Sequence, residues 1–70
     1  MPKTVIAQNL WSESIGACLS NASDLANVHF PALQMNADFD QNIGVIEEAL
    51  KTLRSNVTQL RTANALTTMN

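Results

Sequence analysis

The sequence has little cysteine and histidine, the residues whose disulfides and metal sites stabilise many small single-chain domains. Cys18 is its one cysteine and His29 its one histidine, which excludes an intrachain disulfide and leaves no cluster of soft metal ligands. Seventy residues form one small domain at most, and such domains often gain stability by oligomerising. A single cysteine is also typical of a reducing compartment, so we expect a cytoplasmic location.

Charge of either sign is scarce, and the four cations form no basic block. Nucleic-acid binders normally carry a basic stripe, because neutralising phosphates releases their counterions. Here Lys51, Arg54 and Arg61 form a short patch at most, and Glu47 and Glu48 lie beside it. The composition therefore argues against a nucleic-acid partner. A small DNA- or RNA-binding regulator that uses this patch stays as the alternative hypothesis.

Long apolar runs are also missing. Gln8, Asn9, Ser12 and Glu13 interrupt the first candidate, and no segment approaches the roughly 20 apolar residues that a membrane-spanning helix needs. No sustained apolar stretch resembling a secretory leader follows Met1. The sequence therefore predicts no membrane contact.

No group of side chains indicates catalysis. Cys18 falls on an apolar helix face, where a thiol behaves as a small hydrophobic side chain rather than as a nucleophile. Glu47 and Glu48 are adjacent and point to different sides of a helix, while Asp38 and Asp40 lie where a helix begins. The two glycines are isolated and form no phosphate-binding loop. We therefore expect a protein that is not an enzyme and that binds neither a cofactor nor a metal.

What the sequence does contain is a ladder of apolar residues in its C-terminal half. From Phe39 onward these residues alternate at intervals of four and three, the heptad pattern whose a and d positions pack one helix against another. The ladder also runs on to Thr67. We call its main part the self-association seam, with the members Phe39, Ile43, Ile46, Leu50, Leu53, Val57, Leu60 and Asn64.

A second ladder with the same spacing lies in the N-terminal half. We call it the helix 1 face, a packing or partner surface with the members Trp11, Ile15, Cys18, Ala22 and Leu25. Trp11 is the member that we single out for binding, because tryptophan is enriched in the hot spots of protein interfaces. The two ladders together predict two helices that each need a partner.

A connector with one proline separates the two helices. Pro31 lacks an N–H group and disfavours helix in the preceding residue, so the first helix ends before it. In the connector we expect Phe30, Leu33 and Met35 to fold back onto the end of the bundle. Residues 1–9 are left open as helix or extended arm. The predicted ranges are about 5–28 for the first helix, 29–37 for the connector, about 38–64 for the second helix and 65–70 for a frayed tail.

The charges that flank the seam favour an antiparallel pair. The e positions read Asp40, Glu47, Arg54 and Arg61, acidic first and basic second. In an antiparallel pair of identical helices e faces e, so Asp40 meets Arg61. By the same rule Glu47 meets Arg54. In a parallel pair e faces g, where only asparagine and alanine stand and no charge is matched.

The same register aligns the layers of the seam. Leu50 faces Leu53 at the centre, and Phe39 faces Asn64 at the ends. Asn64 at an a position favours a parallel pair instead, because a buried asparagine at such a position fixes the register of parallel coiled coils. The first helix could also cover the seam within the chain, since a short connector favours antiparallel neighbours.

These two uses of the seam combine in one fold. We expect an all-α protein, an antiparallel helical hairpin that dimerises into a four-helix bundle or antiparallel coiled coil. The expected function is that of a small non-catalytic interaction module, either an adaptor, an inhibitor or an assembly subunit. Its expected partners are a second copy of itself and another protein.

Overall fold

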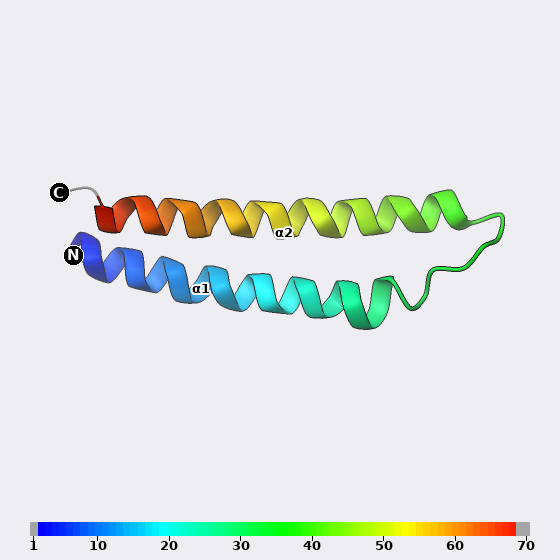
Figure 1. Cartoon of the computed structure of the whole chain (residues 1–70), viewed down its shortest axis with the longest axis horizontal. Coiled ribbons are helices and arrows are strands. Elements are labelled where there is room, and N and C mark those ends of the chain that lie inside the picture. The colour runs from blue at the N-terminus through cyan, green and yellow to red at the C-terminus, as the bar shows by residue number, and fades with distance from the viewer. Residues whose placement is uncertain (1, 69–70) are drawn as a thin grey trace.

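The computed structural model describes residues 2–68. The chain forms helix α1 (Lys3–Asp24), a short π-helical continuation η1 (Leu25–His29) and helix α2 (Phe39–Thr68). The two long helices pack against each other in antiparallel orientation, so the start of α1 and the end of α2 lie at the same end of the molecule (Figure 1). The prediction of an all-α helical hairpin is confirmed for the described residues. The molecule is a thin rod with extents of 54 × 16 × 14 Å.

α1 begins earlier than its sequence pattern indicates. The backbone N–H groups of Val5 and Ile6 both donate hydrogen bonds to the Pro2 carbonyl, at 3.1 and 3.2 Å. Proline suits this place because the N–H that it lacks would have no partner within the helix. The extended arm left open for the first nine residues is therefore not formed, since the helix begins at Lys3.

α1 continues into η1 through a wider turn. The N–H of Phe30 donates to the carbonyl of Leu25 at 3.0 Å, five residues back, which is the bond of a π-helix. A π-helical turn contains more residues than an α-helical turn, so residues spaced four apart stay on one side of the helix. The residues at this spacing that are buried or half-buried are Asn21, Leu25 and His29. The helical path ends at His29, directly before the connector, as Pro31 predicts.

The connector packs less than expected. Leu33 is half-buried, but Phe30 is half-exposed and Met35 is 97% exposed, so the prediction that all three fold back onto the bundle end is wrong for the latter two. A hairpin of two helices has only a narrow end, which offers little apolar surface for connector side chains to cover. The connector leads into α2 through Asn36, whose Oδ1 accepts the N–H of Asp38 at 2.9 Å.

α2 is longer than predicted. It continues to Thr68, so the part of the expected frayed tail over 65–68 is helical, while Met69 and Asn70 lie outside the described residues. Tertiary packing explains the difference, because Ala7 near the start of α1 lies beside Ala63 and supports the last turns of α2. The Thr67 hydroxyl also donates to the Asn64 carbonyl at 2.7 Å.

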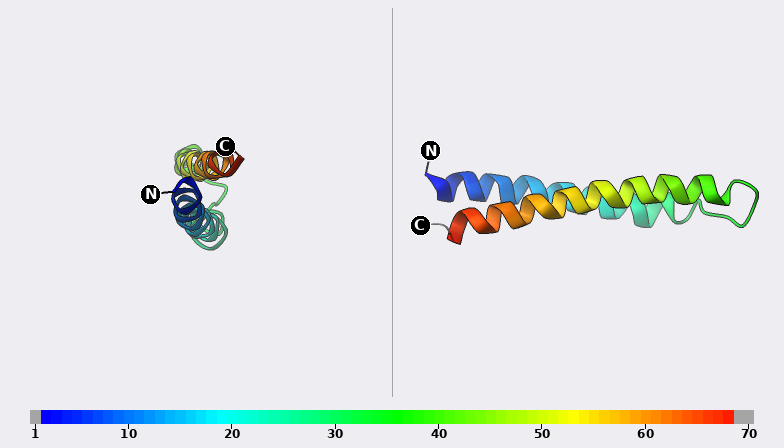
Figure 2. Two further views of the ribbon diagram at one scale, coloured as in Figure 1. Left: turned by 90° about the vertical axis from the view of Figure 1, so that its left-hand side faces the viewer. Right: turned by 90° about the horizontal axis from the view of Figure 1, so that it is seen from above.

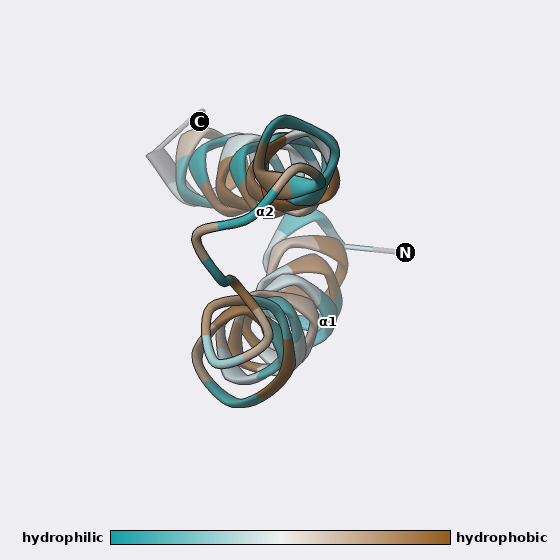
Figure 3. Ribbon diagram, turned by 90° about the vertical axis from the view of Figure 1, so that its right-hand side faces the viewer, coloured by the Kyte–Doolittle hydropathy of each residue, from teal (hydrophilic) through white to brown (hydrophobic). Residues whose placement is uncertain are grey.

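The contact between α1 and α2 buries few side chains, and most are small. Ala7 and Ala63 are each 1% exposed, and Ser14, Leu25 and Ile46 are also buried. Small residues let the two helices approach closely at the end where α1 begins and α2 ends. Seen from above, α2 crosses over α1 at a shallow angle (Figure 2). Hydropathy colouring shows the apolar residues of α2 on the side that faces α1 (Figure 3).

Candidate interaction surface

The self-association seam is divided between two environments. Three of its d positions face α1, with Ile46 buried and Leu53 and Leu60 half-buried, whereas the first, Phe39, is 38% exposed. Its a positions lie on the flank, where Leu50 is 40% and Val57 39% exposed. Part of the seam is therefore used inside the chain, as expected if the first helix covers it, while Leu50 and Val57 remain accessible to a partner.

α1 covers a row of α2 that the ladder did not include. The g positions, next to d on the side away from a, are all buried or half-buried: Asn42, Ala49, Asn56 and Ala63. Two of these residues are asparagine, so a search for apolar residues misses them. Their shared property is small size, which suits the close approach of another helix.

The helix 1 face is rotated away from α2 in the same manner. Leu25 is buried and Ile15 and Cys18 are half-buried, but Ala22 is exposed and Trp11 is 48% exposed. The row that does face α2 precedes this face by one residue for most of its length, with the members Ala7, Leu10, Ser14, Ala17 and Asn21. Its polar serine and asparagine hid it from a pattern of apolar spacing.

The helix 1 face and the a positions of the seam lie on the same side of the hairpin. Trp11 of α1 and Asn64 of α2, the last a position, line one pocket. The opposite side is more polar, with Glu13 of α1 and Gln59 of α2 lining a shallow groove. We call the first side the open apolar side, with the members Trp11, Ile15, Cys18 and Ala22 of α1 and Ile43, Leu50 and Val57 of α2.

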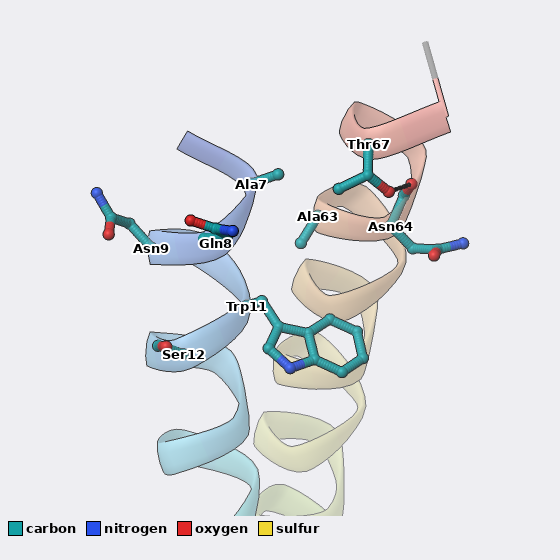
Figure 4. A pocket seen from close by; sticks show the side chains of 8 residues that line it. All are labelled: Ala7, Gln8, Asn9, Trp11, Ser12, Ala63, Asn64 and Thr67. Carbon is teal, nitrogen blue, oxygen red and sulfur yellow. Dashed lines mark hydrogen bonds between the residues drawn. The ribbon is translucent and has the colours of Figure 1, made fainter. Parts of the chain in front are cut away.

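A pocket around Trp11 has a volume of about 570 Å³. We call it the Trp11 pocket, lined by Ala7, Gln8, Asn9, Trp11, Ser12, Ala63, Asn64 and Thr67. The indole projects from α1 toward α2, across the space between the two helices (Figure 4). None of the eight residues is charged, so the pocket suits an apolar or neutral group rather than an ion.

A row of charges borders the open apolar side along α2. The e positions Asp40, Glu47, Arg54 and Arg61 are all exposed. Glu47 and Arg54 line one shallow groove with Leu50. Arg54 and Arg61 line the next one, with Val57. Apolar residues with a charged rim are the usual anatomy of a protein interface.

The chemistry of the described residues adds no second kind of site. Over residues 2–68 no three His, Cys, Asp or Glu side chains gather as metal ligands, and no buried side-chain polar atom lacks a hydrogen-bond partner. No helix in this range is long and apolar enough to cross a membrane. Cys18 is a free, half-buried thiol.

Comparison with known proteins adds no relative. No protein family matches the chain, and neither a curated protein nor a solved structure is significantly similar to it. The surface itself is therefore the basis for a functional proposal.

Proposed function

We propose that this chain is a small, non-catalytic protein–protein interaction module that works through its open apolar side and associates with itself. In this role it is an adaptor, an inhibitor or an assembly subunit, and the second copy completes the bundle to which a further protein binds. A cytoplasmic location fits the role, because the free Cys18 on this side stays reduced there.

The exposed area is the observation that carries the proposal. The chain exposes 5259 Å² of surface. A globular monomer of 7.6 kDa exposes only about 4,300 Å² by the scaling of surface with mass. The excess of about 1,000 Å² is close to the roughly 800 Å² that each partner buries in a standard protein interface. One more packed layer is thus what the hairpin needs to resemble an ordinary small domain.

The position of the exposed apolar residues supports the same proposal. Single exposed apolar residues are normal, but a contiguous row marks an interaction site. Leu50 and Val57 lie two turns apart along α2, and Trp11 and Ile15 continue the surface on α1. In a four-helix bundle each helix contacts two neighbours, one on each flank of its a and d positions. α1 occupies the g flank of α2, which leaves the e flank for a helix of another chain.

Absolute mass in solution, measured by light scattering over a concentration series, tests the proposal. A concentration-dependent rise from 7.6 kDa to twice that value is expected. A chain that stays at 7.6 kDa up to high concentration contradicts the self-association, and its open apolar side would then have to bind a different protein.

A nucleic-acid-binding regulator is the second candidate, and one observation favours it. Lys51 and Arg54 line one shallow groove and Arg54 and Arg61 the next, so the three cations form a continuous exposed row. Glu47 lines the first groove as well and offsets part of this charge. Binding to generic duplex DNA that weakens as salt is raised would support this candidate. No binding at low salt would remove it.

A further inference from the structure

The exposed aromatic side chains lie toward opposite ends of the rod. The Trp11 pocket lies at the end where the chain begins and α2 finishes (Figures 1 and 4). At the connector end Phe39 and Phe30 are 38% and 50% exposed. Within one chain these two ends are separated by most of the 54 Å length, so they cannot cover each other.

We propose that the Trp11 pocket binds the Phe39 side chain of a second copy of this chain. The inference rests on the self-association proposed above and names the contact that would form at each end of the dimer. In an antiparallel pair of α2 helices, the connector end of each copy lies beside the pocket end of the other. A two-fold axis then forms the same contact twice, once at each end.

Charge complementarity sets the register of this pair. The exposed carboxylates of Asp40 and Glu47 lie in the first half of α2, and the guanidinium groups of Arg54 and Arg61 lie in the second half. Antiparallel pairing matches each acidic group with a basic one, whereas in a parallel pair these residues face asparagine and alanine and no charge is matched.

The same register places Phe39 against the pocket. With Leu50 of one copy facing Leu53 of the other, Phe39 faces Asn64. Asn64 lines the Trp11 pocket. The ring therefore enters between the indole and α2.

The chemistry of the pocket suits an aromatic ring. Its lining combines the methyl groups of Ala7 and Ala63 and the half-exposed indole of Trp11 with five neutral polar side chains. A phenyl ring beside an indole gains from offset or edge-to-face contact in addition to burial. No charged group lines the space, so the ring enters without removing an ion from water.

An engineered disulfide tests the contact directly. Residues 39 and 64 of one chain are about 37 Å apart along α2, at a rise of about 1.5 Å per residue. A disulfide requires Cα atoms within about 7 Å, so a bond between these positions can form only between two chains. In a Cys18→Ser background, the Phe39→Cys, Asn64→Cys double variant is expected to form a covalent dimer under mild oxidation, seen on a non-reducing gel.

The two single variants are the matched controls. Phe39→Cys alone and Asn64→Cys alone, each in the Cys18→Ser background, are expected to remain monomeric on the gel, because identical positions lie far apart in an antiparallel pair. A covalent dimer from either single variant would show parallel pairing and overturn the inference. A helical double variant without a cross-link would overturn it as well.

The wild-type chain offers a second measurement, which does not depend on the folding of a variant. Trp11 is the only tryptophan, and the chain has no tyrosine, so its emission reports this pocket alone. Emission is expected to shift to the blue over the same concentration range in which the mass doubles. Phe39→Ala is expected to weaken association at least tenfold, whereas Leu19→Ala, at a site 67% exposed, should leave it unchanged.

The outcomes separate this inference from the proposed function. If the mass doubles while Trp11 emission stays constant and Phe39→Ala associates as the wild type does, the pocket contact is wrong and self-association stands. If the mass never rises, both are overturned.

Discussion

Two rows of α2 with nearly the same composition lie in opposite environments. The d row, with Ile46 and Leu53, packs against α1, while the a row, with Leu50 and Val57, stays at the surface. Their own side chains do not explain the difference, because these four residues are all aliphatic. Their neighbours do: the g flank beside d holds alanine and asparagine, and the e flank beside a holds long charged side chains. A helix packs where the flank is small and uncharged.

The largest expected effect comes from a charge on the exposed row. Leu50→Asp puts two carboxylates at the central layer of the proposed dimer, and burying them without partners is strongly unfavourable. We expect a monomer at every concentration, measured by light scattering. Val45→Asp is the control, since Val45 is similarly exposed and lines a groove on the opposite side of the hairpin. If Leu50→Asp stays dimeric and helical, the a row is not the interface.

A pair of alanine substitutions sharpens the comparison between the two rows. Ile46→Ala removes a buried side chain between the helices and should lower the free energy of unfolding by about 2–5 kcal/mol. Leu50→Ala should cost the isolated monomer less than about 1 kcal/mol, because this side chain already contacts water. Urea unfolding at concentrations below dimerisation measures both. Equal losses would mean that the two rows do not differ.

A glycine substitution tests whether helix stability and association are separable. A Cβ at Gly16 meets nothing within 4 Å, and Gly16 lies in the interior of α1. Gly16→Ala should therefore raise the free energy of unfolding by about 1 kcal/mol through helix propensity alone. The dissociation constant of the dimer should stay the same in sedimentation experiments. A weaker dimer would show that another helix approaches closely at this position.

The smallest expected effect concerns the charged e row. Arg54→Glu should weaken the antiparallel dimer by about 1 kcal/mol or less, because exposed ion pairs contribute little. Adding Glu47→Arg in the same chain should restore the affinity, since the exchanged charges again face each other. The dissociation constants of the single and the double variant, measured at low salt, test this expectation. Absence of any restoration would count against the pairing of e with e.

Much of the fold follows from the sequence through local rules. Pro31 ends the first helix, and the four-three spacing of apolar residues predicts two helices that need partners. The helix boundaries that differ from the predicted ones, at Lys3 and Thr68, lie where the two helix ends support each other. A contact between residues about sixty positions apart has no local signal.

The candidate site was only partly predictable. Spacing identified Trp11, Leu50 and Val57 as members of packing faces, but it also included Ile46 and Leu53, which α1 covers. Ser14, by contrast, is buried in the contact although its hydroxyl breaks the apolar pattern. Periodicity finds apolar faces, whereas burial between two close helices also depends on side-chain size.

The sequence by itself determined that the chain forms two amphipathic helices, because helical periodicity is a property of nearby residues. Only the tertiary structure decided which row of each helix lies inside and which stays open. That choice depends on how closely two particular surfaces can approach, and alanine at positions such as Ala7 and Ala63 allows an approach that the charged flank prevents. The same packing places both ladders toward the open apolar side and leaves that side uncovered.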